Sequence, residues 1–175
     1  CLLSRGLGDV YKRQVIGGCL YGPWRLRGKK ADVIFVFGLS PVTLALPAIL
    51  LGRIKRVPVV MLVLDLWPES LAAIGIVRSP RILGWVGYMV KFIYERCTLI
   101  LGQSRSFLGS IAERCSNTDK IHYFPSWAEE VFDNPKLVPA PEVPLQDDLF
   151  TVLFAGNIGE AQDFPAILNA IEALK

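Results

Sequence analysis

Two acidic residues in the stretch LDLWPES, residues 64–70, are placed where chemistry could occur. Asp65 closes an apolar run, and Glu69 follows directly after Pro68. Ligands of open α/β sheets bind at the carboxyl ends of the strands, so Asp65 stands where reacting groups are usually found. Pro68 and Glu69 also suit the first turn of a helix, where a carboxylate complements the helix dipole. The residues alone leave both interpretations open.

The stretch LFAGNIGEAQDF, residues 153–164, is typical of a strand that passes through a glycine-bearing turn into a helix. In such a turn, backbone N–H groups and the positive end of the helix dipole suit a phosphate. Gly156 and Gly159 would let the backbone approach an anion closely, and Asn157 adds a donor. A plain strand-to-helix turn is the alternative. The stretch matches neither G-x-G-x-x-G nor a P-loop, which argues against a dehydrogenase or an ATPase.

Residues 1–14, CLLSRGLGDVYKRQ, differ in origin from the rest in our interpretation. The peptide DVYKRQ is what GAT GTG TAT AAG AGA CAG encodes, and that string is similar to the mosaic-end adapter of transposon-based sequencing libraries. We interpret residues 1–14 as an adapter artefact and exclude them from the fold prediction. A genuine amphipathic N-terminus is the alternative.

Charge and cysteine content narrow the class of protein. Residues 1–14 hold three basic residues and one acidic residue, so the net charge of +3 falls to +1 without them. That balance gives no support to a nucleic-acid partner. The remaining cysteines, Cys19, Cys97 and Cys115, contain no C-x-x-C pair and indicate neither a disulfide framework nor a zinc site. We therefore expect a cytoplasmic protein.

Two runs that are apolar on both faces, residues 31–38 and 57–65, predict buried parallel strands. The segment between them predicts a helix with Ser40 as its cap and Pro41 as its first residue. Residues 33–51 carry no charge and are long enough to span a bilayer, which is the alternative. Ser40 and Pro41 interrupt that stretch where a strand should pass into a helix, which favours a βαβ unit.

A second helix is predicted to begin with Ser79 as its cap and Pro80 as its first residue, and to end near Cys97. Its charged residues fall on one narrow stripe, and apolar side chains such as Trp85 and Phe92 cover the rest of its circumference. A helix of this kind is either enclosed in protein or lies on a membrane surface. The sequence leaves both possibilities open.

The rest of the chain continues the alternation of strands and helices. Residues 97–104 and 120–125 predict strands, and residues 104–115 predict a helix that Ser104 or Ser106 can cap. His122 lies inside an apolar strand, where a structural role is more common than catalysis. The alternation indicates an α/β fold with an open, doubly wound parallel sheet.

A proline-rich stretch separates this sheet from the C-terminal part of the chain. Residues 133–149 hold four prolines and little periodicity, so we interpret them as a linker. Residues 150–175 then predict a strand and a helix that begin a second domain.

Four stretches, taken in order, resemble the bacterial glycosyltransferases of family 4: DLWPESLAAIGI, YERCTLILGQS, KIHYFPSWAEEVF and FTVLFAGNIGEAQDFPAILNAIEALK. The nearest likeness is to the fucosyl and N-acetylfucosaminyl transferases of capsule, O-antigen and colanic-acid biosynthesis. The resemblance covers nearly all of residues 31–175. The combination of D-x-W-P-E-S with F-A-G-N-I-G is more specific than either motif alone.

The resemblance implies the GT-B architecture, in which two Rossmann-like domains face each other across a cleft. Residues 15–132 would form the later part of the acceptor-side domain, residues 133–149 the linker, and residues 150–175 the start of the nucleotide-sugar-binding domain. Such enzymes transfer a sugar from a nucleotide diphosphate with retention at the anomeric carbon, and they need no metal or other cofactor. The implied acceptor is a polyprenyl-diphosphate-linked sugar or a polysaccharide, which implies a cytoplasmic enzyme that is peripheral on the inner face of the plasma membrane.

The resemblance also assigns roles to the glycine-bearing turn. Gly156, Asn157 and Gly159 would face the donor diphosphate. Gln162 falls where many family members have a lysine, and a neutral amide can donate only a hydrogen bond to a leaving group that gains charge. Either a cation comes from elsewhere in the protein, or backbone amides supply most of the stabilisation.

On the acceptor side, the resemblance places Asp65 where it could orient or deprotonate the attacking hydroxyl, with Glu69 as a weaker partner. The family's pair of donor-site glutamates would lie beyond Lys175. We therefore expect the parent gene product to be a glycosyltransferase and this fragment to be inactive alone.

Two other functions are compatible with parts of the pattern. A GT-B sugar-nucleotide epimerase shares the architecture but needs acid and base residues that we do not find. A polytopic membrane protein would use residues 33–51 and 82–101 as spans, although Lys91, Glu95 and Arg96 interrupt the second of these.

Overall fold

The computed structural model describes residues 2–75, 77–127, 130, 152–156, 158 and 162–174, without the side chains of residues 2–12. The chain divides into two compact units, Cys1–Ser126 and Trp127–Lys175. The linker predicted at residues 133–149 lies outside the described residues. Among the described residues, almost all of the regular structure belongs to the first unit.

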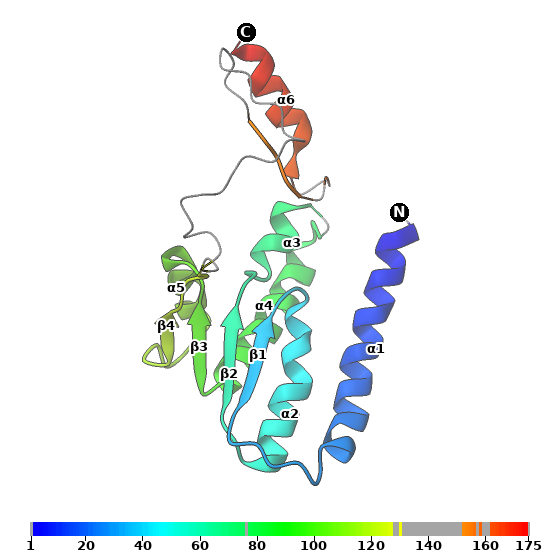
Figure 1. Ribbon diagram of the computed structural model, residues 1–175, viewed down its shortest axis with the longest axis vertical. Helices are drawn as coiled ribbons and strands as arrows, with labels where there is room; N and C mark the ends of the chain where they lie inside the picture. The colour runs from blue at the N-terminus through cyan, green and yellow to red at the C-terminus, as the bar shows by residue number, and fades with distance from the viewer. Residues whose placement is uncertain are drawn as a thin grey trace. The chain divides into compact units, whose positions relative to one another are not determined.

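Within the described residues, a four-stranded parallel sheet forms the centre of the first unit (Figure 1). Each strand after the first pairs with the strand that precedes it in the sequence. The first pair places Ile34 opposite Val59. The predicted α/β class with a parallel sheet is therefore confirmed. The strands, in their order across the sheet, are β1 (Ile34–Gly38), β2 (Val59–Val63), β3 (Leu99–Gly102) and β4 (Ile121–Tyr123).

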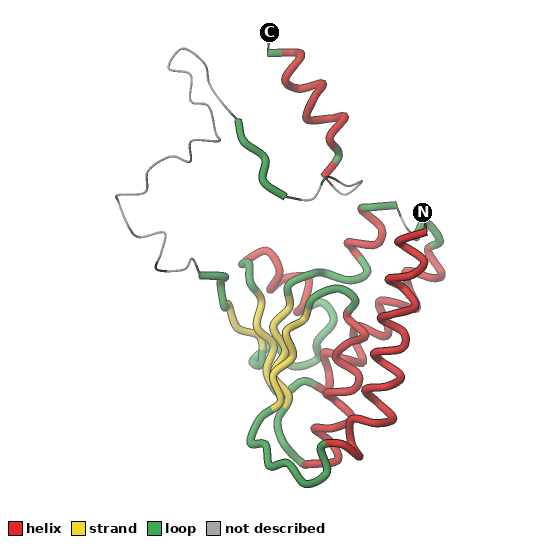
Figure 2. The backbone as a smooth tube through the Cα atoms, turned by 45° about the vertical axis from the view of Figure 1, so that its right-hand side comes forward, coloured by secondary structure: helices red, strands yellow, loops and turns green. Residues whose placement is uncertain are grey.

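Helices join and flank these strands (Figure 2). The first helix packs against the helix that follows β1, and a Cβ added at Gly18 would lie 2.8 Å from Cγ of Pro47. Gly18 therefore permits a close approach of the two helices. In chain order the helices are α1 (Leu2–Arg25), the short 3₁₀ helix η1 (Val42–Leu44), α2 (Ala45–Lys55), α3 (Glu69–Ala73), α4 (Pro80–Arg96), α5 (Arg105–Ala112) and α6 (Phe164–Ala173).

One face of the sheet carries the hydrophobic core. Val36, Met61 and Ile100 occupy adjacent register positions on this face, and none is more than 7% exposed. Full burial of an aliphatic side chain of this size contributes about 1.5–3 kcal/mol. Helices α2, α4 and α5 complete the same cluster with Ala45, Val90, Ile93, Tyr94 and Ile111.

The opposite face of the sheet is less covered. Phe35 and Phe37 alternate with Val36 along β1, and each is 54% exposed. The strand order does not reverse within the described residues, and right-handed crossovers that proceed in one direction place their helices on one face. The first unit is therefore consistent with part of a Rossmann-like, doubly wound sheet.

The chain after β1 differs from the helix start that we predicted. Pro41 precedes η1, and α2 begins only at Ala45, with Leu44 at its N-cap. The prediction that Ser40 caps this helix is wrong because the Ser40 hydroxyl donates a hydrogen bond to Asp65 instead. Residues 33–51 accordingly form a strand, a 3₁₀ turn and a helix rather than one continuous helix.

Helix α4 begins as predicted, with an extended Ser79 at the N-cap and Pro80 in the first turn, although the Ser79 side chain makes no capping hydrogen bond. Its apolar residues divide between two environments. Val90 is fully buried, whereas Trp85 and Tyr88 are 78% and 72% exposed, so the helix is not enclosed in protein on every side. Among the described helices, none combines the length and the hydropathy needed to cross a bilayer.

The second unit contains α6, which confirms the predicted helix and has Pro165 in its first turn. The strand predicted at residues 150–156 is not formed by residues 152–156. A strand is defined by ladder hydrogen bonds, and no described segment pairs with these residues. An apolar, β-branched sequence is not sufficient without a neighbouring strand.

Helix α1 continues without a break across residue 14. The backbone therefore shows no boundary at the end of the segment that we interpret as an adapter artefact. That interpretation stays a prediction.

Candidate functional site at the carboxyl edge of the sheet

The carboxyl edge of the sheet brings Ser40 and Asp65 together. Gly38 at the end of β1 pairs with Val63 at the end of β2. Ser40 and Asp65 each follow two residues later, and the Ser40 hydroxyl donates to Oδ2 of Asp65 at 2.6 Å. The site predicted at Asp65 thus includes a second residue from the neighbouring strand.

Three side chains donate hydrogen bonds to the Asp65 carboxylate. Besides Ser40, Nε1 of Trp67 donates to Oδ2 at 3.1 Å, and the Ser70 hydroxyl donates to Oδ1. Trp67 Nε1 also donates to the Ser40 hydroxyl oxygen at 2.9 Å. The carboxylate therefore ties the loop after β1 to the loop after β2.

This arrangement determines what Asp65 can do chemically. A carboxylate offers about four lone-pair positions, two on each oxygen. Oδ2 accepts two hydrogen bonds and Oδ1 accepts one, so Oδ1 keeps a position for one further donor. A substrate hydroxyl bound there would be held in a fixed direction, because the three protein donors orient the carboxylate.

Glu69 has a different environment. It is the first residue of α3, as the helix-start interpretation of Pro68 and Glu69 expects. Its Oε1 lies 2.7 Å from a guanidinium nitrogen of Arg114, and its Oε2 is buried and accepts no hydrogen bond from the described residues. The Glu69 carboxylate is thus engaged in an ion pair, and among the described residues no hydrogen bond joins it to Asp65.

The ion pair lies beside Tyr94 of α4. Burial raises the pKa of the Tyr94 hydroxyl far above its ordinary value, with Arg114 lowering it and Glu69 raising it by smaller amounts. Tyr94 therefore stays neutral at any physiological pH. It contributes packing to this region rather than acid–base chemistry.

The third strand joins the same edge. Gln103, just after β3, donates from Nε2 to the Leu64 carbonyl at 3.0 Å. Ser104 caps α5 by accepting a hydrogen bond from the Ser106 backbone, which confirms its predicted role as a cap. His122 is exposed and belongs to β4, which lies two strands away from the strand that Asp65 follows. In the part of the chain that the structure describes, no group of three acidic, histidine or cysteine side chains could hold a metal ion.

In the second unit, the structure describes Gly156 and Gln162 of the predicted diphosphate-binding turn, whereas Asn157 and Gly159 lie outside the described residues. A Cβ added at Gly156 would lie 3.3 Å from the Phe154 ring. That ring packs edge-on against Phe164 of α6, with centroids 5.0 Å apart. A side chain at position 156 would therefore press on the Phe154 ring.

Sequence reasoning missed Ser40, Trp67 and Ser70 as neighbours of Asp65. A signal for Ser40 was present, because the ends of adjacent parallel strands meet at one edge and Ser40 follows its strand as Asp65 follows the next. Ser40 was instead assigned to the helix cap, since serine before proline is also the usual pattern of a helix start. Trp67 and Ser70 carry no comparable signal, because their positions depend on the turn geometry.

Comparison with known proteins found no matching family model and no matching solved structure. Among curated proteins, the chain is similar to the probable glycosyltransferase WbjE of Pseudomonas aeruginosa, with 26% identity over 178 aligned residues. The alignment takes in 99% of this chain and 43% of the relative, so the chain spans less than half of that protein's length. The likeness extends along both units.

Proposed function

We propose that this chain is part of a retaining glycosyltransferase of the GT-B type, related to family 4, that acts in cell-surface polysaccharide biosynthesis. The observation that carries the proposal is the similarity to a probable glycosyltransferase along 99% of the chain. The parallel sheet with polar side chains gathered at its carboxyl edge agrees with it. The donor would be a nucleotide-diphosphate sugar, and the acceptor a lipid-linked sugar or a polysaccharide.

In this proposal the acceptor hydroxyl bonds to the anomeric carbon of the donor as the bond to the diphosphate breaks. Asp65 receives that hydroxyl at the remaining acceptor position of Oδ1 and orients it. Glu69 supports the loop through its ion pair with Arg114. The hydroxyl proton would pass to Oδ1 of Asp65 as the new bond forms, so Asp65 would both orient and deprotonate the hydroxyl.

In this proposal the second unit binds the diphosphate of the donor. Backbone amides near Gly156, Asn157 and Gly159 would face the diphosphate, and Gln162 would donate a hydrogen bond to it. Negative charge grows on the diphosphate as the sugar leaves, so fixed donors at this place lower the barrier. No metal or other cofactor takes part.

The proposal also places α4 on a membrane surface. Trp85 and Tyr88 project from the same side of the helix, and both are more than two-thirds exposed. Aromatic side chains with an apolar body and a polar tip favour the boundary between lipid and water. Such a position would bring a lipid-linked acceptor to the enzyme at the inner face of the plasma membrane.

The activity test uses the full-length gene product. Its coding sequence is obtained by reading genomic DNA across both ends of this sequence. The whole product is incubated with radiolabelled nucleotide-diphosphate sugars and a lipid extract of its source cells. We expect transfer from one donor into the lipid fraction, with the anomeric configuration retained by NMR, and no transfer by residues 1–175 alone. No transfer from any donor, or an inverted product, would contradict the proposal.

The membrane test replaces two exposed aromatic residues together, Trp85→Ser and Tyr88→Ser. The variant should no longer float with phospholipid vesicles, because it loses most of the exposed apolar area with which α4 would contact the membrane. Tyr123→Ser, which removes an exposed aromatic residue from β4, is the control and should float as the unchanged protein does. Equal flotation of all three proteins would remove the membrane contact from the proposal.

A further inference from the structure

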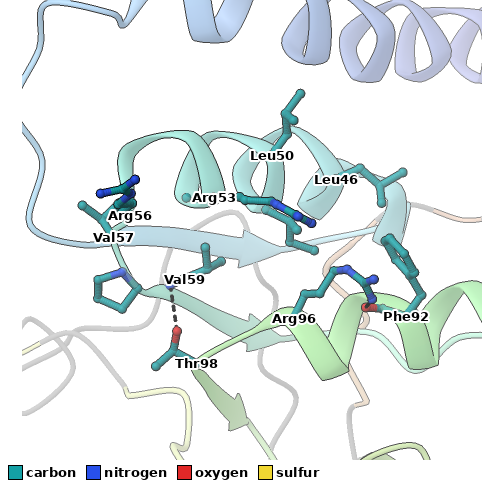
Figure 3. A pocket seen from close by; sticks show the side chains of 12 residues that line it. Leu46, Leu50, Arg53, Arg56, Val57, Val59, Phe92, Arg96 and Thr98 are labelled. Atoms are coloured by element: carbon teal, nitrogen blue, oxygen red, sulfur yellow. Dashed lines mark hydrogen bonds between the residues drawn. The ribbon is translucent and has the colours of Figure 1, made fainter.

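The amino edge of the sheet, opposite to the carboxyl edge, carries a cavity between α2 and α4 (Figure 3). Its volume is about 670 Å³. Leu46 and Leu50 of α2 and Phe92 of α4 form apolar walls. At the base, a Cβ added at Gly52 would lie 2.5 Å from Val59, so this glycine lets α2 lie against the strand.

Three arginines surround this apolar space. Arg53 and Arg56 come from the end of α2, and Arg96 comes from the last turn of α4. Figure 3 shows Arg53 and Arg96 reaching from their two helices into the same space. None of the described residues that line the cavity is acidic, and neither Arg53 nor Arg56 forms an ion pair with any of the described residues.

The Arg96 side chain is held in place. Its Cζ lies 3.5 Å from the centroid of the Phe92 ring, and its Nη1 donates to the Phe92 carbonyl at 3.2 Å. This stacking leaves the remaining guanidinium donors available to a ligand. An oriented arginine loses less conformational entropy when it binds an anion than a freely rotating one does.

The two helix ends do not neutralise the arginines. Each helix C-terminus carries about half a negative charge, so α2 and α4 together offset about one of three positive charges. A net positive charge above an apolar wall is complementary to a ligand that has an anionic head and an apolar body. Arginine is suited to phosphate because its planar fork can donate two parallel hydrogen bonds.

We infer that this cavity binds the phosphate headgroup of an anionic phospholipid, with the first part of the acyl chain against Leu50 and Phe92. The inference rests on the proposed membrane contact of α4 and names the lipid chemistry that this contact selects. Trp85, Tyr88, Phe92 and Arg96 follow one another at spacings of three, four and four, so they share one side of α4. The cavity therefore lies at the end of the same exposed surface.

The test is flotation with two kinds of vesicle, phosphatidylcholine alone and phosphatidylcholine mixed with phosphatidylglycerol. The double variant Arg53→Gln with Arg96→Gln should lose about 30-fold in affinity for the anionic vesicles, because each basic residue at a charged membrane contributes about fivefold. The matched control, Arg25→Gln with Arg27→Gln, changes the net charge equally at exposed positions outside the cavity and should lose about threefold or less. Equal losses in both variants would overturn the inference.

A second variant keeps the charge and removes the space. Leu50→Trp should fill the cavity and weaken binding to the anionic vesicles while leaving the arginines in place. Circular dichroism of each variant checks that the fold is unchanged. Undiminished binding of Leu50→Trp would also overturn the inference.

Two further measurements distinguish a phospholipid site from a site for a free anion, and the headgroup site from the membrane contact of α4. Inorganic phosphate at constant ionic strength should not displace the protein from anionic vesicles, and displacement would identify a site for a free anion instead. If Trp85→Ser with Tyr88→Ser releases the protein but the arginine pair does not, the headgroup inference fails and the membrane contact stands. If the unchanged protein does not float with either vesicle, both fail, and sugar transfer to a soluble acceptor remains a separate measurement.

Discussion

At the residue scale, Asp65 and Ser40 meet because their strands are parallel and in register. Asp65 accepts hydrogen bonds from Ser40, Trp67 and Ser70, so one carboxylate holds two loops. Hydrogen bonds to a charged group contribute about 1.5–3 kcal/mol each when the partner is not exposed to water. The same residue therefore contributes to stability and prepares a site for a hydroxyl group.

The substitution Asp65→Asn tests the stabilising part of this role. An amide can accept on only one of its two terminal atoms, so at least one of the three donors loses its partner. We expect a loss of about 1–3 kcal/mol in the free energy of unfolding, measured by urea denaturation. Asp32→Asn, at an exposed residue outside the network, should change it by less than about 0.5 kcal/mol. Equal effects of the two substitutions would show that the network contributes nothing to stability.

Sequence reasoning identified Asp65 and misassigned Ser40 for a physical reason. A serine hydroxyl can cap a helix or donate to a carboxylate, and the local pattern supports only the first interpretation. The strand register decides between them, and register is a property of the folded sheet. The roles of Asn157 and Gly159 stay predictions, because both lie outside the described residues.

At the element scale, α4 shows why an apolar helix pattern was ambiguous. Its buried side contains Val90, Ile93 and Tyr94, and its other side exposes Trp85 and Tyr88. Residues of similar hydropathy occupy both sides, so periodicity alone could not separate enclosed from exposed positions. The boundaries of α4 could be predicted because a serine followed by proline marks its start.

Helix α4 also holds the segment that follows α5. The Glu95 carboxylate accepts hydrogen bonds from the backbone N–H and the hydroxyl of Ser116, each at 2.7 Å. These bonds hold the pKa of Glu95 below its ordinary value of 4.5. The carboxylate form is therefore favoured by folding.

This contact makes part of the stability depend on pH. A pKa that is lower in the folded state gives stabilisation that is present above about pH 4.5 and is lost as the pH falls through the folded pKa. Ser116→Ala should move the pKa of Glu95 back toward its ordinary value, as measured by NMR titration of the side-chain carboxyl. The difference in stability between the protein and Glu95→Gln should be larger at pH 7 than at pH 3. An equal difference in stability at the two pH values would contradict the assignment.

At the scale of the whole molecule, every core residue that is buried among the described residues belongs to the first unit. The described residues of α6 contain none that is buried. Cooperative unfolding follows the burial of apolar surface, so it should be a property of residues up to Ser126.

A protein that ends at Ser126 tests this expectation. Its urea midpoint should match that of the full chain, and the dependence of the unfolding free energy on urea should change little, since little buried surface is removed. Circular dichroism during urea titration gives both quantities. Loss of the cooperative transition would mean that residues 127–175 are needed for the core.

The fold class could be predicted from the sequence because buried parallel strands leave long apolar runs, as in residues 31–38 and 57–65. The strand order could not be predicted, since it depends on which strands pair in the folded sheet. The predicted strand at residues 150–156 was wrong for the described residues because strand formation depends on a partner that composition does not reveal. The cavity between α2 and α4 had no sequence signal, because its arginines also have the ordinary role of basic residues at helix ends.

The order of the strands also affects how the protein is made. A chain leaves the ribosome with its N-terminal part first, at about 5–20 residues per second. Each strand of this sheet pairs with the one translated just before it, so β1 has a partner as soon as Val59–Val63 emerges. No early strand among the described residues waits for a distant segment, and the sheet can grow one strand at a time during translation. The nascent chain is thereby spared a long period with unpaired apolar strands exposed to other chains.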